Sequence, residues 1–389
     1  MSVFQKVEAH LGVDIGAGGI KLVELRKVKG RPQLWTYGYA NRAMNIHEQF
    51  LSTEKTPEEL AAEKRTKLLG TSSVTKEVDV AGPAFDERLI QEYGTLLKTI
   101  AQKSRVTTKR ATASLPVSQV FHAIVTLPRV DKKELDFHVR AKVKKILPRP
   151  IEEMQVLHQD ITDELTPDGL KGEKNNKDMR VLVTAAPLAL IQFYSKIFAY
   201  AGIELEELET EAFALERSLV GHEKGVVMIV DIGSERTNFF IIDHGIPLIH
   251  RSIQIGGGWF DTKLQEYLGV DPGEAAQIKH DALSLRAADL PTDLFVSAID
   301  PIIKEIQSSF DLFLHQSGNE AKHPEKIIFT GGAALFPSIV SSVREAFPLK
   351  VFIGDPWARV IYQQGLKRVL DGLGPRMAVA IGLAMRNIV

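Results

Sequence analysis

Two separate segments of the sequence carry the same four residues, and these residue types suit phosphate and metal binding. Val13-Asp14-Ile15-Gly16 and Val230-Asp231-Ile232-Gly233 each continue an apolar run. Glycine lets main-chain N–H groups approach phosphate oxygens closely, and turn amides form anion-binding nests. An aspartate carboxylate can hold hydrated Mg²⁺, a hard ion that prefers oxygen ligands. The two segments together therefore predict a site for a magnesium-bound nucleoside triphosphate.

Neighbouring residues extend this predicted site. Lys21 would neutralise phosphate charge, and Ser234 and Thr237 would donate hydroxyl hydrogen bonds. A third loop at residues 330–333 stands between a predicted strand and a predicted helix, where a purine could lie against bare backbone. The predicted phosphate-binding and base-binding residues are Gly16, Gly18, Gly19, Lys21, Gly233, Ser234, Thr237, Gly331, Gly332 and Ala333, with Asp14 and Asp231 as metal ligands.

The repeated residues lie at the turns of two predicted hairpins. Residues 11–15 and 20–28 have the composition of strands, and a glycine-rich turn joins them. Residues 225–232 and 238–243 repeat this arrangement around a second turn. One such hairpin in each half of the chain predicts two lobes with pseudo-symmetric halves.

The other elements are predicted from apolar periodicity and from residues that begin or end helices. Residues 86–102 carry apolar side chains at the spacing of one buried helix face. Further strands are predicted at residues 111–115, 120–127, 156–161, 179–185 and 326–330. Further helices are predicted from 131 to before Pro148, at 188–200, 260–267, 272–283 and 301–314, from after Ala334 to near Phe347, and from Gly374-Pro375 almost to Val389.

The composition excludes several classes of protein. The chain has 389 residues, of which 44% are hydrophobic and 25% charged, as in globular proteins of two or three domains. Because Lys and Arg number 48 against 49 Asp and Glu, no basic field predicts a nucleic-acid partner. The absence of cysteine excludes disulfides and thiolate metal sites. No stretch approaches the roughly 20 apolar residues of a membrane span, so we expect a cytoplasmic protein without direct membrane insertion.

Two charged segments leave their roles open. Residues 45–79 are rich in charge and contain Thr56-Pro57-Glu58-Glu59, a good helix start, so they are either a solvated insertion or a functional one. The helix predicted from Asp131 carries lysine and arginine side chains as far as Arg149. That basic face could contact an acidic partner or lipid headgroups, or simply be solvated.

The order of these motifs resembles the superfamily that contains actin, sugar kinases and FtsA. Asp14–Lys21 and Asp231–Thr237 resemble its two phosphate motifs, and Gly331–Ala333 resembles its adenosine loop. Residues 209–215 and 378–384 resemble its two connecting helices. The middle of the chain, at residues 114–116, 125–128, 146–153, 181–187 and 201–203, resembles more specifically the PilM family of actin-like proteins of type IV pilus assembly.

This resemblance implies an actin-like two-lobed α/β fold, with duplicated ribonuclease H-like subdomains and an inserted small α/β subdomain of the FtsA/PilM type. Lobe I would comprise residues 1–113, 184–222 and 375–389, the inserted subdomain residues 114–183, and lobe II residues 223–374. ATP or ADP with Mg²⁺ would occupy the cleft between the lobes. The resemblance implies Asp14, Asp231 and Glu211 as catalytic residues and Lys279 as a further nucleotide-binding residue.

The resemblance also implies partners. The protein would be an adaptor that binds the N-terminal cytoplasmic peptide of a PilN-like bitopic inner-membrane protein in a nucleotide-sensitive way. A groove beside the small subdomain would take this peptide, and other platform proteins and a second copy of the chain are further candidate partners. The protein would then be peripheral at the inner membrane.

Several residues depart from the superfamily pattern. Ser234-Glu235-Arg236-Thr237 replaces a smaller, glycine-containing turn, Ala333 replaces a third glycine, and Ala276 replaces a glutamate that contacts ribose or adenine. We therefore expect nucleotide binding with slow or absent hydrolysis. An FtsA-like filament-forming protein and a small-molecule kinase of the same superfamily stay as alternatives.

Overall fold

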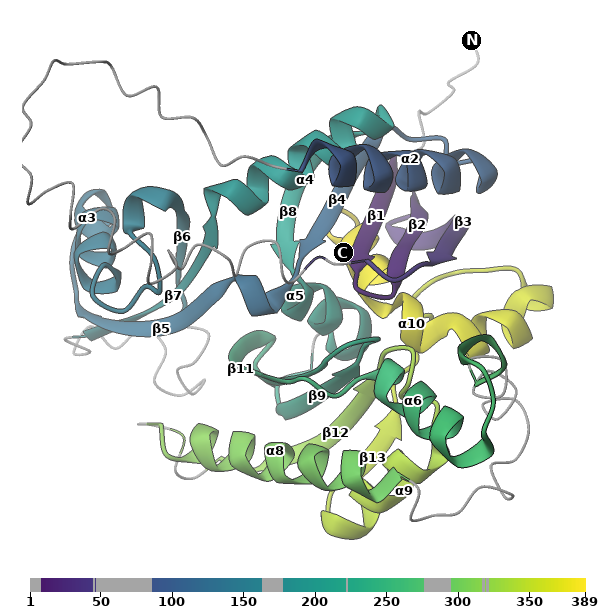
Figure 1. The fold of residues 1–389 in the computed structure, drawn as a ribbon. Coiled ribbons are helices and arrows are strands. Elements are labelled where there is room, and N and C mark those ends of the chain that lie inside the picture. Colours follow the sequence, from purple (N-terminus) through teal and green to yellow (C-terminus); the bar gives the residue numbers. More distant parts are fainter. Residues whose placement is uncertain are drawn as a thin grey trace, which may run out of the picture.

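Two five-stranded sheets with one shared topology form the framework of the molecule (Figure 1). The computed structural model describes residues 8–44, 46, 86–162, 178–221, 223–275, 295–316, 319 and 322–389. The first sheet has the order β3-β2-β1-β4-β8, with β1 at Ala9–Gly16, β2 at Gly19–Val28, β3 at Arg31–Asn41, β4 at Arg110–Leu115 and β8 at Glu204–Thr210. The second has the order β11-β10-β9-β12-β13, with β9 at Val226–Ile232, β10 at Thr237–Asp243, β11 at Ile246–Ile253, β12 at Pro324–Thr330 and β13 at Lys350–Ile353.

The pairing of the strands is the same in both sheets. The first three strands of each sheet, in chain order, pair antiparallel as two successive hairpins. A later strand then pairs in parallel with the first one (β4 with β1, β12 with β9), and a last strand pairs in parallel with that later strand (β8 with β4, β13 with β12). Asp14 pairs with Lys21 in the first sheet, and Asp231 pairs with Asn238 at the equivalent place in the second. The predicted duplication is thus confirmed, and it puts each aspartate beside a hairpin turn.

A smaller antiparallel sheet stands to one side of the two lobes in Figure 1. Its order is β5-β7-β6, with β5 at Phe121–Pro128, β6 at Met154–Asp160 and β7 at Asp178–Pro187. Helix α3 (Lys132–Val143) packs against it through Leu135, Val139 and Val143, which follow one another at a spacing of four residues. This sheet and its helix agree with the small subdomain expected in the middle of the chain.

Helices cover the sheets and bury their apolar faces. Helices α2 (Glu87–Lys103) and α4 (Leu188–Ala201) pack on the first sheet, and α6 (Gly257–Leu268), α8 (Val296–Leu314) and α9 (Pro337–Ala346) pack on the second. The short helix α5 (Glu211–Leu215) follows β8 and continues as a π-helical turn at Glu216–Val220. Short 3₁₀ turns occupy Val117–Gln119, Ile151–Glu153 and Gln364–Leu366.

The long helix α10 (Lys367–Met385) lies between the lobes and contacts both of them (Figure 1). It packs against β1 and β2 of the first sheet, against α5, and against β12 of the second sheet. The contact with α5 is made backbone to backbone, because a methyl group on Gly382 would overlap the main chain of Ala214. Helix α10 therefore links elements of both lobes.

The structure corrects the predicted start of the last helix. Gly374-Pro375 does not begin it, because α10 already begins at Lys367 and contains Pro375 in its interior. A proline inside a helix removes one main-chain donor and is usually disruptive. Here the Pro375 carbonyl oxygen instead accepts hydrogen bonds from Gly331 N at 2.9 Å and from Thr330 Oγ1 at 3.0 Å. Tertiary contacts thus accommodate a residue that the sequence indicates as a helix start.

Four strands, β3, β8, β11 and β13, are not among the predicted elements. Strands β3 and β11 each extend a predicted hairpin by a third strand. Strand β8 includes Glu209 and Thr210, so the first connecting helix begins at Glu211 and not at Glu209. The helix predicted at 272–283 begins at Pro272, and its part beyond residue 275 lies outside the described residues. The insertion at 45–79, except for residue 46, also lies outside them.

Candidate functional site

A cavity of about 300 Å³ lies where the two repeated hairpin turns meet. Strands β1 and β2 bring lobe I residues to it, β9 and β10 bring the equivalent residues of the second sheet, and α10 closes one side. The cavity is lined by Asp14, Gly16, Ala17, Gly18, Lys21, Asn41, Ile46, Val117, Ser118, Glu211, Asp231, Gly233, Ser234, Glu235, Arg236, Asn238, Gly257, Gly331, Gly332, Ala333, Pro375, Arg376 and Val379. Residues from distant parts of the chain thus form one site.

Asp14 is held in place by two side chains. Lys21 Nζ donates to its Oδ2 at 2.9 Å, and Ser114 Oγ donates to its Oδ1 at 3.0 Å. Asp14 is almost completely buried, so these two hydrogen bonds compensate for the loss of water around the carboxylate. Pairing across the β1–β2 ladder explains why Lys21 reaches Asp14, because the two residues are direct neighbours on antiparallel strands.

Two further carboxyl groups face Asp14 and have raised pKa values. Burial first, and then the charges of Asp14 and Asp231, raise the pKa of Glu211 to about 8. Burial and the charge of Asp14 raise the pKa of Asp231 to about 7, although Lys21 opposes this change. Val117 N donates to Glu211 Oε2 at 3.4 Å, which favours the ionised form only weakly. Three neighbouring acids with one lysine are the arrangement that a bound cation would stabilise.

The turn after Asp231 is fixed by main-chain hydrogen bonds. Gly233 N donates to Arg236 O at 2.9 Å, and Gly258 N donates to Ser234 O at 2.8 Å. The glycine segment before α6 approaches this turn so closely that a Cβ on Gly256 would lie 2.6 Å from the Glu235 carbonyl carbon. The three consecutive glycines at 256–258 therefore pack against the turn at 233–236 and hold it in place.

The turns of the two lobes touch each other. A Cβ atom added to Gly18 would lie 2.9 Å from Ser234 Cβ, which is closer than carbon atoms approach without repulsion. Glycine at position 18 is therefore what allows the turn of the first sheet to reach the turn of the second. The structure shows the interlobe site with its two turns in contact.

The third predicted loop also reaches the cavity. Gly331 has a φ of +91°, a conformation that favours glycine, and it packs against the main chain of Ile232. Gly332 and Ala333 line the cavity, and the side chain of Arg376 lies beside Gly332. The loop thus presents a surface without large side chains between β12 and α10.

Most of the predicted site residues come together, but two of the described ones, Gly19 and Thr237, do not line the cavity. Thr237 is fully buried, and its Oγ1 donates to Ile255 O at 2.6 Å, so its hydroxyl group faces away from the site. Gly19 is the first residue of β2 and has a φ of +122°, so its role is to allow the tight turn. Lys279 lies outside the described residues.

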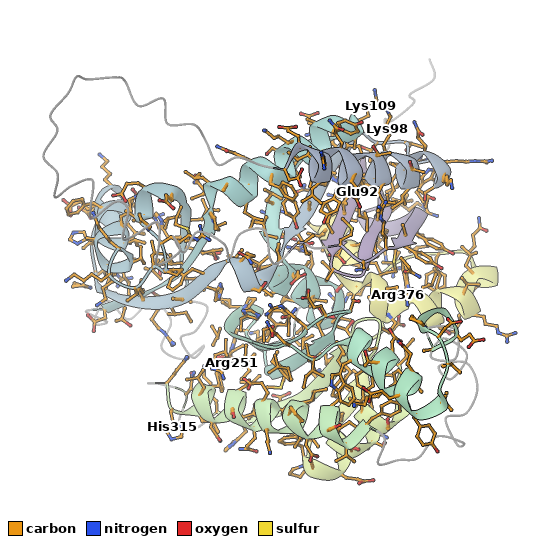
Figure 2. All side chains as sticks on the ribbon, viewed as in Figure 1. Glu92, Lys98, Lys109, Arg251, His315 and Arg376 are labelled. Atoms are coloured by element: carbon orange, nitrogen blue, oxygen red, sulfur yellow. The ribbon has the colours of Figure 1, made fainter. Side chains whose placement is uncertain are left out.

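The structure adds site residues that the sequence reasoning missed. Asn238 follows Asp231 by the same seven residues that separate Lys21 from Asp14, so the repeat itself could have indicated it. In the sequence, Arg236 was noted only because its segment replaces the glycine-containing turn of the superfamily, and it was not predicted as a site residue. Arg376 donates to Asn41 Oδ1 at 3.3 Å and lies over the ring of Tyr39. Figure 2 labels Arg376 on α10, beside the boundary between the lobes.

Metal binding at this cavity would need ligands beyond the protein. Among the described residues, no group of three His, Cys, Asp or Glu side chains is arranged to hold a metal ion. Asp14 and Asp231 are carboxyl groups on facing turns, and burial together with the charge of Asp14 raises the pKa of Asp231, so a cation between them would favour its ionised form. The pair therefore fits a cation that keeps water or phosphate oxygens as its other ligands, as Mg²⁺ does.

A second, larger hollow of about 610 Å³ separates the small sheet from the first lobe. Strands β6 and β8, which are edge strands of their sheets, form opposite walls, and α4 contributes a third side. We call it the edge-strand groove. It is lined by Leu115, Gln155, Leu157, His158, Gln159, Leu182, Thr184, Ala186, Ile191, Ser195, Leu205, Glu206, Glu207, Leu208, Glu209, Thr210, Phe213 and Arg386.

Ion pairs fix one wall of the edge-strand groove. Arg217 Nη1 donates to Glu209 Oε1 at 2.8 Å, and its Nη2 donates to Glu209 Oε2 at 3.0 Å. Arg386, just after α10, pairs with both Glu207 and Glu209. Arg217 also donates to Gly382 O at 2.5 Å. The groove wall on β8 is thereby tied to α10, which lines the interlobe cavity.

No helix among the described residues is both long and apolar enough to span a bilayer. Comparisons with known proteins then give relatives of the chain. A family model described as type IV pilus assembly protein PilM matches residues 61–388. The cell division protein FtsA of Enterococcus hirae is 22% identical over 330 residues, which cover 76% of this chain and 74% of FtsA.

Two solved structures resemble the fold over nearly its whole length. A chain of the PilM-PilN type IV pilus biogenesis complex superposes with a TM-score of 0.72 and 21% identity, over 98% of both chains. The ethanolamine utilization protein EutJ from Carboxydothermus hydrogenoformans superposes with a TM-score of 0.50 and 15% identity, over 97% of this chain and 89% of EutJ. At these identities the likeness concerns the fold.

Proposed function

The chain belongs to the PilM family of type IV pilus assembly proteins, whose model spans residues 61–388, and from that premise we propose that it is a nucleotide-binding adaptor of a pilus assembly platform. Its fold is the actin-like two-lobed α/β fold of its structural relatives. The nucleotide, the peptide and the coupling between them are the parts of this proposal, and each has its own support and test.

The nucleotide proposal is carried by one observation, the convergence of two equivalent aspartate-bearing turns on a single cavity. ATP or ADP would occupy it with phosphates against the turns of Gly16 and Gly233 and the base near Gly332. Asp14 and Asp231 would hold Mg²⁺, which when bound neutralises phosphate charge. Lys21 would then exchange part of its contact with Asp14 for a phosphate oxygen.

Slow or absent hydrolysis is part of this proposal. Glu211 occupies the position of the water-orienting residue in the family resemblance, at the first residue of α5. Its pKa is raised to about 8, so at neutral pH the carboxyl group is mostly protonated. A protonated carboxyl group cannot accept a proton from an attacking water molecule. Burial and the charges of Asp14 and Asp231, which raise this pKa, thus support the slow hydrolysis in our proposal.

Calorimetry with Mg-ATP and Mg-ADP tests the nucleotide part. We expect the wild type to bind, and Asp231→Asn, which keeps the size of the side chain but removes its charge, to lose most of the Mg²⁺-dependent affinity. Asp311→Asn on the exposed surface of α8 is the matched control, because it removes one carboxylate far from the cavity. A wild-type protein that gives neither heat nor a thermal shift with saturating nucleotide would refute this part.

The partner part of the proposal places a PilN-like N-terminal peptide in the edge-strand groove. The related solved structure is described as a complex of PilM with PilN. In this chain β6 and β8 are edge strands, and an extended peptide can pair with the free main-chain groups of such strands. Leu157, Leu205 and Leu208 line the groove and offer apolar contacts for peptide side chains. The protein would thereby be held at the inner membrane.

Fluorescence polarisation with a labelled N-terminal peptide of the cognate PilN-like protein tests the partner part. Leu157 is 59% exposed, so Leu157→Glu should leave the fold intact while it places a charge in the groove. We expect at least tenfold weaker peptide binding for this variant. Leu312→Glu, at a side chain that is 44% exposed on α8, is the control and should bind as the wild type does. Equal binding by both variants would exclude the groove.

Nucleotide sensitivity is supported by elements that line both hollows. Helix α10 contributes Pro375 and Val379 to the interlobe cavity, and the residue just after it, Arg386, lines the groove. The β8–α5 segment contributes Glu211 to the cavity and Phe213 to the groove. Binding free energies are reciprocal, so peptide should change nucleotide affinity by the same factor as nucleotide changes peptide affinity. Identical peptide affinities with ATP, with ADP and without nucleotide would remove the coupling.

A further inference from the structure

Arg236 is a cavity residue whose guanidinium Nε atom has no hydrogen-bond partner among the described residues. It lines the interlobe cavity beside Glu235 and Asn238. That Nε atom is completely buried, so water does not reach it either. A buried donor without an acceptor costs free energy unless a ligand supplies one. The group is therefore placed for an anion that enters the cavity.

The other cations of the cavity are already engaged. Lys21 Nζ donates to Asp14 Oδ2 at 2.9 Å, and Arg376 donates to Asn41 Oδ1 and lies over Tyr39. Asn238, which occupies the place of Lys21 in the second hairpin, carries no charge, and its Oδ1 is also buried without a partner among the described residues. The second hairpin thus lacks a lysine at that position, and Arg236 is its cavity-facing cation.

The backbone of Arg236 is fixed independently of its side chain. Its carbonyl oxygen accepts from Gly233 N at 2.9 Å, which closes the turn. Gly256 packs against the main chain of the same turn, where a Cβ would lie 2.7 Å from Arg236 N. The planar guanidinium fork matches phosphate oxygens, so arginine loses less freedom per hydrogen bond than lysine does. Substitution of the side chain should therefore leave the fold unchanged.

We propose that Arg236 is a phosphate-binding residue of the interlobe site, which contacts the phosphate chain of the nucleotide and makes its affinity less dependent on Mg²⁺. This inference rests on the nucleotide part of the proposed function. It adds one phosphate-binding residue and a weaker dependence of the nucleotide affinity on Mg²⁺. The glycine-containing turn expected from the superfamily pattern would offer only main-chain N–H groups. In this chain, the same turn adds a permanent positive charge that a metal ion would otherwise have to supply.

The test is calorimetric titration of ATP and of inorganic tripolyphosphate, each with excess Mg²⁺ and with EDTA, into wild type, Arg236→Gln and Arg236→Lys. A hydrogen bond to a charged group corresponds to roughly a 10- to 100-fold change in affinity. We expect Arg236→Gln to lose about that factor for ATP in EDTA, and less with Mg²⁺. Arg236→Lys should lose less in both conditions, because it keeps the charge but not the planar fork.

Arg251→Gln is the matched control, since Arg251 lies on the surface of the same lobe (Figure 2) and pairs with Glu305 away from the cavity. It should bind ATP within twofold of the wild type, and the unliganded melting temperatures of all variants should agree. If the wild type binds ATP and Arg236→Gln equals it in EDTA, the role of Arg236 is refuted while the proposed function stands. If the wild type binds neither ATP nor tripolyphosphate, the proposed function fails and this inference fails with it.

Discussion

Contact between the two turns leads to a sharp prediction about Gly18. Replacing Gly18 with alanine puts a methyl group 2.9 Å from Ser234 Cβ. Carbon atoms in van der Waals contact lie roughly 3.5–4.0 Å apart, so the new methyl group and Ser234 Cβ must move apart by about 1 Å. Ser234 Cβ is fixed to a turn that the glycines at 256–258 support, so rotation of the hydroxyl group does not relieve the overlap. The two lobes have to separate at this point.

The size of the effect follows from that displacement. Overpacking of this kind costs roughly 1–3 kcal/mol, and here the cost falls on the state in which the turns meet. Because the proposed phosphate site needs both turns, we expect Gly18→Ala to weaken Mg-ATP binding by about 5- to 100-fold. Global stability should change little, since the lobes can relax apart. Gly365→Ala, where an added Cβ meets nothing within 4 Å, is the matched glycine control.

A double-mutant cycle isolates the contact. Ser234→Gly removes the atom that the new methyl group overlaps, so the variant Gly18→Ala/Ser234→Gly should bind Mg-ATP more tightly than the sum of the single effects predicts. Coupling between residues in contact is typically about 0.5–3 kcal/mol. Isothermal titration of the wild type, both single variants and the double variant gives this value. Additivity within about 0.3 kcal/mol would show that the turns do not meet in solution, and the reasoning would be wrong.

Three more predictions concern stability. Gly382→Ala should destabilise the protein by roughly 3 kcal/mol in urea unfolding, because its methyl group overlaps the Ala214 backbone. Arg217→Ala should cost about 2–4 kcal/mol, because it leaves the 5%-exposed Glu209 with fewer donors. Burial lowers the pKa of His250 to about 4, so below pH 6.5 this side chain gains a proton in the unfolded chain but not in the native state. The free energy of unfolding should therefore fall as the pH decreases from about 6.5 to 4, by at most roughly 1.4 kcal/mol per pH unit.

Controls for these three measurements exist in the same chain. Gly372→Ala lies in α10 in open space and should be neutral or slightly stabilising. Lys367→Ala breaks only an exposed pair with Asp371 and should cost less than about 1 kcal/mol. His250→Phe can keep the stacking on Phe240 and should remove the His250 part of the pH slope. A slope that persists unchanged in His250→Phe would assign the acid sensitivity to other groups.

Local patterns were sufficient to predict much of the fold. The Val-Asp-Ile-Gly repeat indicated two hairpins at equivalent places, because a turn between two apolar runs is a local property of the chain. Helix α2 was predictable from its apolar face for the same reason. Strand β8 was not, since its sequence Glu204–Thr210 contains four glutamates, a residue type that is depleted in strands. The predicted start of α10 was wrong because Pro375, a residue typical of helix starts, lies here inside the helix.

The candidate site divides in the same way. The sequence by itself determined which residues could bind phosphate and metal, because Asp14, Asp231 and their glycines carry that chemistry wherever the chain places them. Only the tertiary structure decided that the two turns touch at Gly18 and that the Thr237 hydroxyl faces away. It also decided that the buried Arg236 Nε atom finds no hydrogen-bond acceptor in the described part of the chain. Distances between segments separated by some 200 residues depend on how the lobes pack, and no local pattern contains that information.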